Sequence, residues 1–184
     1  VLSTKSGEVI AMASVRINDK GVYEVTSGNI AVVDTDEPGS VVKTITVAAA
    51  LNEGTVTPDT YLEVPWRKMY SDTMLHDAEQ HPTESWPVSK ILSKSSNIGT
   101  TEVMLRLGAT LRETTEKEYS YMTAFGLGSK TPLDFPGESN GLLKDWKKLE
   151  GAEQYTVGYG QGVGTTSIQL AAAVNVLAND GMYV

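Results

Sequence analysis

A serine and a lysine three positions apart are the residues of this sequence best suited to covalent chemistry. Ser40 and Lys43 end the run Glu-Pro-Gly-Ser-Val-Val-Lys at positions 37–43. On a helix, residues three apart share a face, so the Lys43 amine would reach the Ser40 hydroxyl. A serine hydroxyl needs an adjacent base, and a lysine serves as one only when burial lowers its pKa. The pair therefore predicts nucleophilic catalysis by Ser40 with Lys43 as its base.

The same pair also has a structural interpretation. Ser-x-x-Lys is expected by chance about once in a chain of ordinary composition and this length. The serine would then be a helix N-cap and the lysine would extend to solvent. Two features favour chemistry: a lysine is costly inside so apolar a segment, and the segment opens with Pro-Gly-Ser. Ser40 would also lie at a helix N-terminus, where free backbone N–H groups stabilise an oxyanion.

The helix that must carry this pair spans 40–51. Its β-branched residues, such as Val41, Val42 and Ile45, favour a strand locally. The segment is nevertheless long for a strand, and Ala48 to Leu51 continue it with strong helix formers before Gly54. Because it is apolar nearly all round, we expect a buried central helix.

A second polar group, Ser95 and Asn97, stands as Ser-x-Asn between two expected short helices. A hydroxyl and an amide held there would relay a proton and hydrogen-bond a substrate amide. Alternatively, the two residues are a helix cap. Ser27-Gly28-Asn29 matches the same pattern, so the motif is weak by itself.

The remaining elements follow from hydrophobic periodicity and from glycine and proline positions. We expect a hairpin over 1–15, a loop with one short strand over 18–29, an irregular excursion over 55–87, helices over 88–93, 99–107, 113–125 and 167–178, a loop over 134–146, a flexible glycine hinge over 158–164, and a strand after Gly181. The whole chain, 1–184, reads as a single domain.

Composition excludes several classes of function. The 184 residues carry a net charge of −8, which argues against a nucleic-acid partner or an anionic lipid surface. Without cysteine there is no disulfide, thiolate metal site or cysteine nucleophile. His76 and His81 are five apart in a proline-rich segment, so we expect no metal there. No apolar run is long enough to span a bilayer.

The chain starts at Val1 and ends at Val184, so we expect a fragment.

Several ordered motifs together resemble the transpeptidase domain of class B penicillin-binding proteins. They cover nearly the whole chain and are Gly-Glu-Val-Ile-Ala-Met-Ala at 7–13, the run at 37–43, Ser-Lys-Ser-Ser-Asn-Ile-Gly at 93–99, Phe-Gly-Leu-Gly at 125–128, Asp-Phe-Pro-Gly-Glu at 134–138, Gly-Gln-Gly at 160–162, Thr-Ser-Ile-Gln-Leu at 166–170 and Ala-Asn-Asp-Gly at 178–181. The resemblance implies an α+β fold of the β-lactamase/transpeptidase type, with an antiparallel sheet flanked by helices.

The resemblance also implies roles for four residues. Ser40 is the nucleophile, Lys43 its base, Ser95 the proton relay to the leaving amine, and Asn97 the group that holds the substrate amide and Lys43. The implied reaction is D,D-transpeptidation: Ser40 attacks the penultimate D-alanine carbonyl of a peptidoglycan stem peptide, D-alanine leaves, and the acyl group passes to an amine of a neighbouring stem. β-Lactam antibiotics would trap the acyl-enzyme. No cofactor or metal is implied.

One family element is missing. Serine–lysine acyltransferases order their motifs as Ser-x-x-Lys, Ser-x-Asn and Lys-Thr-Gly, but here only Lys5-Ser6-Gly7 is similar, and it precedes Ser40. We interpret it as a turn, and we expect a fold that lacks its C-terminal strands and a fragment with little activity alone.

The resemblance further implies where the longer protein works. The longer protein that carries this chain would be anchored by an N-terminal transmembrane helix and would act on the extracytoplasmic face of the bacterial membrane. It would bind a membrane glycosyltransferase and serve cell division or cell shape. Two alternatives stay open: a class D-like β-lactamase or β-lactam sensor, which would be distinguished by deacylation, and a degenerate domain that only binds partners.

Overall fold

The computed structural model describes residues 1–26 and 28–184. Ser27, which with Asn29 repeats the Ser-x-Asn pattern, lies outside the described residues. The contacts divide the chain into two compact units. The larger unit comprises 37–122 and 143–163, and the smaller unit comprises 1–36, 123–142 and 164–184. That the whole chain forms a single domain stays a prediction.

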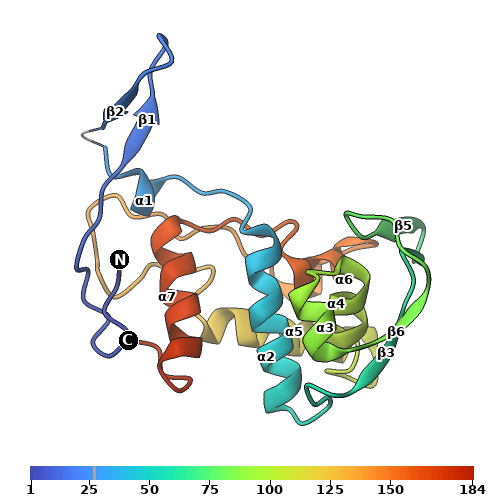
Figure 1. The fold of residues 1–184 in the computed structure, drawn as a ribbon. Helices are drawn as coiled ribbons and strands as arrows, with labels where there is room; N and C mark the ends of the chain where they lie inside the picture. The colour runs from blue at the N-terminus through green and yellow to red at the C-terminus, as the bar shows by residue number, and fades with distance from the viewer. Residues whose placement is uncertain (27) are drawn as a thin grey trace. The chain divides into compact units, whose positions relative to one another are not determined.

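The expected buried helix lies at the centre of the larger unit. It starts as a 3-10 turn, η1 (Gly39–Val42), and continues as α2 (Lys43–Asn52). Val42, Ile45 and Ala49 are at most 2% exposed, because α2 packs against α3 (Val88–Ser93) and α4 (Asn97–Met104) (Figure 1). Burial of the β-branched side chains on this face outweighs their local preference for a strand.

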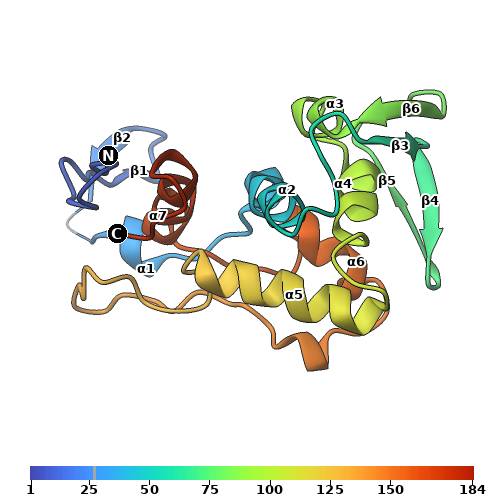
Figure 2. The same ribbon diagram turned by 90° about the horizontal axis from the view of Figure 1, so that it is seen from below.

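Other predicted helices of the larger unit are confirmed with small shifts. The segment 88–93 coincides with α3, 99–107 is represented by α4, and 113–125 by α5 (Leu111–Ala124), whose residues through Met122 belong to this unit. Figure 2 shows α2 beside α4, with four short strands on the other side of α4.

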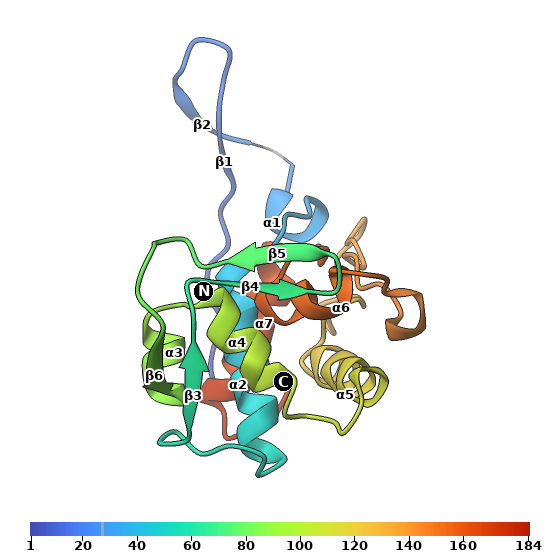
Figure 3. The ribbon, with the colours of Figure 1, turned by 90° about the vertical axis from the view of Figure 1, so that its right-hand side faces the viewer.

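The prediction of an irregular excursion over 55–87 is wrong. The segment forms β3 (Tyr61–Val64), β4 (Arg67–Tyr70), β5 (Thr73–His76) and β6 (Glu84–Pro87). β4 and β5 form a hairpin, and β3 pairs antiparallel with β6, so that Leu62 faces Trp86 (Figure 3). The prolines mark strand ends, and the alternation of buried and exposed residues in β3 is too short to stand out in the sequence.

The smaller unit is built around α7 (Ser167–Ala178), which confirms the helix predicted over 167–178. It packs against α1 (Ile30–Val33) (Figure 1). Thr166 and Gln169 form a capping box at its start. The Gln169 amide also donates to the carbonyls of Ser129 (2.6 Å) and Asn140 (2.9 Å), so one side chain joins the helix start to the 123–142 segment.

Replacing Thr166 with alanine should lower the free energy of unfolding by about 1 kcal/mol, because the Gln169 N–H at the start of α7 loses its side-chain acceptor. Urea denaturation followed by circular dichroism measures this. Ser167→Ala, at an exposed neighbouring position, is the matched control and should change little. Equal effects of the two substitutions would contradict the capping role of Thr166.

The N-terminal hairpin lies further along the chain than predicted. Residues 1–14 contain a single antiparallel bridge, between Leu2 and Val9. The regular hairpin is β1 (Val15–Ile17) with β2 (Tyr23–Val25), in the stretch predicted to be mostly loop. Its turn is organised by the Asn18 carboxamide oxygen, which accepts from the N–H groups of Lys20 and Val22. Such side-chain bonds to the backbone set the position of a turn, and the pattern of apolar residues does not indicate them.

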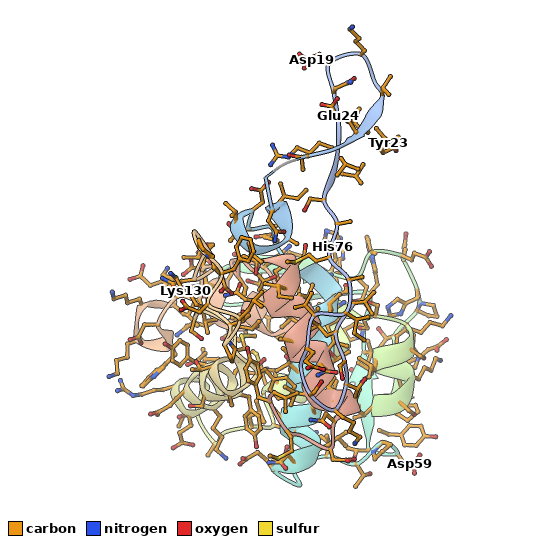
Figure 4. The ribbon with its side chains drawn as sticks, turned by 90° about the vertical axis from the view of Figure 1, so that its left-hand side faces the viewer. Asp19, Tyr23, Glu24, Asp59, His76 and Lys130 are labelled. Atoms are coloured by element: carbon orange, nitrogen blue, oxygen red, sulfur yellow. The ribbon has the colours of Figure 1, made fainter. Side chains whose placement is uncertain are left out.

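The side chains of this hairpin are exposed on both faces. Val15, Ile17, Tyr23 and Val25 share one face of the ribbon and are between 47% and 79% exposed. Figure 4 labels Asp19, Tyr23 and Glu24 on the hairpin.

The segment 158–164, predicted to be a flexible glycine hinge, begins in a helical turn, and its flexibility stays a prediction. Residues 158–163 belong to the larger unit. They follow η2 (Trp146–Lys148) and α6 (Glu153–Thr156) and begin within the helical turn η3 (Val157–Tyr159). Gly160 is in the left-handed region (φ 88°), and a Cβ there would lie 2.3 Å from the Gly39 carbonyl oxygen. The glycines thus permit close packing against the segment that carries Ser40.

The predicted fold class is confirmed: helices combine with small antiparallel sheets, three strand pairs in the part of the chain that the structure describes. Within the same part, no helix is both long and apolar enough to cross a membrane.

Candidate active site

Lys43 is a buried lysine at the start of α2. It is 1% exposed. Its ammonium donates to the Ser95 hydroxyl (3.0 Å) and to the Ser95 carbonyl, and lies 5.9 Å from the centre of the Tyr159 ring. Burial lowers the pKa of Lys43 to about 8, against the opposing charge of Asp77. A lysine in this environment is poised to act as a base near neutral pH.

Ser40 lies in η1 and is exposed. Among the described residues, none is hydrogen-bonded to its hydroxyl, so the expected contact with Lys43 is replaced by the bonds from Lys43 to Ser95. The position of Ser40 is set by its neighbours. Gly39 contacts Gly160, and the Glu37 carboxylate accepts from the Gly162 N–H at 3.0 Å. The two motifs at 37–43 and 160–162 therefore hold one another.

Ser95 lies between α3 and α4, as predicted, whereas Asn97 is the first residue of α4. Ser95 is in the left-handed region (φ 55°). Ser96 caps α4, since its hydroxyl accepts from the Gly99 N–H at 2.7 Å. The Asn97 amide donates to the His76 carbonyl at 3.0 Å. Asn97 is thus tied to β5 rather than to Lys43.

These residues meet at one cavity of the larger unit. A pocket of about 590 Å³ has Ser40, Ser95 and Asn97 in its wall, together with Asp77 and His81. Lys43 reaches the same place through its bonds to Ser95. Ser40 and the 95–97 segment therefore line one pocket, and that they form one catalytic site stays a prediction.

Asp77 is the important residue that the sequence did not reveal. It is 5% exposed, and its carboxylate accepts from the Ser96 hydroxyl (2.7 Å) and the Ile98 N–H (2.9 Å). It thereby fixes the turn between Ser95 and α4. No motif surrounds Asp77 in the sequence, because its partners are supplied by a later helix.

His81 is held as a cation beside Asp77. Its Nε2 lies 3.0 Å from the Asp77 carboxylate and its Nδ1 lies 2.8 Å from the Pro82 carbonyl. Both neighbours only accept, so both ring nitrogens must donate. Burial opposes the charge, but these two bonds raise the pKa of His81 overall. The ring stacks on Trp86 at 4.6 Å between centroids.

Among the described residues, no group of three or more metal-binding side chains is found around His76 and His81. The Nδ1 of His76 lies 2.8 Å from the Asp77 carbonyl. The imidazoles are therefore used in hydrogen bonds near the pocket.

Two other motifs have structural roles in the smaller unit. In the 134–138 motif, the Glu138 carboxylate accepts from the backbone N–H (2.8 Å) and the hydroxyl (2.7 Å) of Thr131, which closes that loop. Lys5-Ser6-Gly7 lies on a turn, where the Gly7 N–H donates to the Ser3 carbonyl at 2.9 Å. Its location agrees with the interpretation of this motif as a turn.

Comparison with known proteins gives consistent matches over the whole chain. A family model described as the penicillin binding protein transpeptidase domain matches residues 1–184. Penicillin-binding protein PbpB of Mycolicibacterium smegmatis is 35% identical over 100% of this chain and 28% of its own length. The probable peptidoglycan D,D-transpeptidase PenA of Neisseria flavescens is 33% identical over 98% of this chain and 44% of its own length.

The solved structures agree with the sequence matches. Penicillin-binding protein 3 of Mycobacterium tuberculosis in its apo form superposes with a TM-score of 0.79 and 33% identity, over 85% of this chain and 34% of that chain. The same protein complexed with ampicillin gives the same TM-score. The chain spans less than half the length of each of these relatives.

Proposed function

Because this chain belongs to the penicillin-binding protein transpeptidase family, we propose that it is the part of a peptidoglycan D,D-transpeptidase that carries the reactive serine. In this proposal Ser40 is the nucleophile, Lys43 its base, Ser95 the proton relay and Asn97 a substrate ligand. The observation that carries the proposal is the buried Lys43, bonded to Ser95 at the pocket that Ser40 lines.

The proposed acylation moves one proton and exchanges one bond. Neutral Lys43 accepts the Ser40 proton as the Ser40 oxygen bonds to the penultimate D-alanine carbonyl carbon. The carbon–nitrogen bond then breaks, and D-alanine leaves as an amine after receiving the proton from Lys43 through Ser95. The Ser40 N–H, at the start of η1, is one proposed donor to the oxyanion. An amine of a second stem then takes the acyl group and frees Ser40.

We propose the following partners and location for the protein that carries this chain. Its substrates are peptidoglycan stem peptides, and β-lactams acylate the same serine, as the ampicillin complex of the relative from Mycobacterium tuberculosis supports. It acts on the extracytoplasmic face of the membrane, where peptidoglycan is assembled. An N-terminal anchor and a glycosyltransferase partner belong to the same proposal.

Labelling with penicillin tests the assignment of Ser40. The natural protein that carries these 184 residues is incubated with benzylpenicillin, digested and analysed by mass spectrometry. We expect one adduct, on the peptide containing Ser40, and none in Ser40→Ala. The matched control is Ser93→Ala, at an exposed serine that lines the same pocket. An adduct elsewhere, or none, would refute the proposal.

The same experiment separates the transpeptidase from a β-lactamase. A transpeptidase should hold the adduct long after free penicillin is removed, whereas a β-lactamase should regenerate free Ser40 quickly. We further propose that residues 1–184 alone react far more slowly, since no Lys-Thr-Gly follows Asn97 in this sequence to complete the oxyanion site. Labelling the 184-residue chain in parallel tests this.

A further inference from the structure

Glu118 is a fully buried carboxyl group that the proposed mechanism does not use. It lies on α5 and is 0% exposed. One of its oxygens lies 2.6 Å from the Thr46 hydroxyl, and the other is buried without a hydrogen-bond partner. An ionised carboxylate buried this deeply would be very costly, because among the described residues no cation is paired with it.

The Thr46 hydroxyl has two neighbours that both require a proton. Besides Glu118, it lies 2.7 Å from the Gly158 carbonyl oxygen. A hydroxyl has only one hydrogen to donate, and a carbonyl only accepts. Thr46 must therefore donate to Gly158, and Glu118 must supply the hydrogen between itself and Thr46. The geometry is satisfied only when Glu118 is a carboxylic acid.

We propose that Glu118, as a neutral acid, is a positioning residue for the active site: it donates to Thr46, which donates to Gly158, and this chain of two bonds holds α2 against η3. Only the expected effect of Glu118 on acylation of Ser40 rests on the proposed function. The hydrogen-bond chain itself is independent of what the protein does.

The two ends of this chain lie next to residues of the site. Thr46 follows Lys43 by three positions on α2, so the two share a face of the helix. Gly158 precedes Tyr159, whose buried ring faces the Lys43 ammonium. Loss of the bonds would let the backbone beside Tyr159 move, and the contact between the Tyr159 ring and the Lys43 ammonium would become less well defined.

The protonation of Glu118 depends on its burial. The groups that face it from α2 and η3 are the Thr46 hydroxyl and the Gly158 carbonyl, and neither titrates. Burial raises the pKa of Glu118 to about 7. A carboxyl whose folded pKa is raised stabilises the fold at low pH, and this contribution is lost as pH rises from about 4.5 to 7.

Thermal unfolding of the 184-residue chain between pH 5 and pH 8 tests the hydrogen-bond chain. From pH 5 to pH 8, the melting temperature of the unchanged chain should fall by about 5 °C more than that of Glu118→Gln. Glutamine supplies a neutral N–H donor to Thr46 at every pH, so the difference isolates Glu118 from His81 and Lys43. Parallel pH curves for the two proteins would overturn the inference.

Acylation of the natural protein by benzylpenicillin tests the positioning role. Glu118→Leu, which has no donor, and Thr46→Val should each lower the first-order acylation step about tenfold, with little change in the initial binding constant. Glu118→Gln, which keeps a neutral donor to Thr46, should restore the rate. Unchanged rates in Glu118→Leu would overturn the positioning role. Absence of a Ser40 adduct in the unchanged protein would instead refute the proposed function and leave the melting result standing.

Discussion

Methionine in place of Lys43 should slow acylation of Ser40 by penicillin about a thousandfold, the contribution expected of a positioned general base. Methionine retains the length and apolar stem of lysine, so it keeps the packing of a side chain that is 1% exposed. What it removes is the amine that bonds to Ser95. The loss should therefore appear in the chemical step rather than in folding.

The pH profile of the unchanged protein provides a second measure of the same group. Only the neutral amine accepts a proton, and the pKa of Lys43 is lowered to about 8. The acylation rate should rise with pH and level off above about 8, an inflection that Lys43→Met should lack. Stopped-flow measurement with a fluorescent penicillin gives both results.

Lys94→Met is the matched control, because Lys94 lines the same pocket but is exposed. Its acylation rate should stay within about twofold of that of the unchanged protein, as expected for a surface substitution. A Lys43→Met protein that acylates at the normal rate would remove Lys43 from the mechanism, and the proposed role of Ser95 as its relay would fall with it.

Removal of the Asp77 carboxylate should destabilise the larger unit by about 3 kcal/mol, because several buried donors lose their acceptor together. In Asp77→Ala, the Ser96 hydroxyl and the Ile98 N–H lose bonds of 2.7 and 2.9 Å. His81 loses its carboxylate at the same time. Urea denaturation of the 184-residue chain measures the change.

The same substitution should also impair acylation, because Asp77 holds the turn that presents Ser95 and Asn97 at the pocket. Glu79→Ala is the matched control, at an exposed carboxylate that lines the same pocket, and it should change stability little. If both variants unfold at the same urea concentration as the unchanged chain, Asp77 does not organise the Ser95–Asn97 turn.

The site was predictable where its chemistry is local. Ser40 and Lys43 lie within one helical turn, and the apolar residues after them predicted a buried helix, which the structure confirms as η1 and α2. Ser95 also lies between two helices, as predicted, although Asn97 already belongs to the second. Periodicity and capping act over a few residues, so the sequence displays them directly.

The strands between 55 and 87 were missed because their pairing is not local. β3 pairs with β6, and the β4–β5 hairpin lies between these two strands in the sequence. Each strand has four residues, too few for a period of two to emerge from a segment rich in prolines. The first hairpin was predicted at the wrong residues for a related reason, because hydrogen bonds of the Asn18 side chain set the position of its turn.

By itself, the sequence determined the family, the helix that bears Ser40 and Lys43, and the second polar motif, because these depend on residue types at short spacing. Only the tertiary structure decided that Lys43 bonds to Ser95, that Asp77 organises the following turn, and that Glu118 meets Thr46. Those partners lie 52, 19 and 72 positions apart. Their meeting depends on how buried surfaces pack, since packing creates the low-polarity surroundings that lower the pKa of Lys43 and raise that of Glu118.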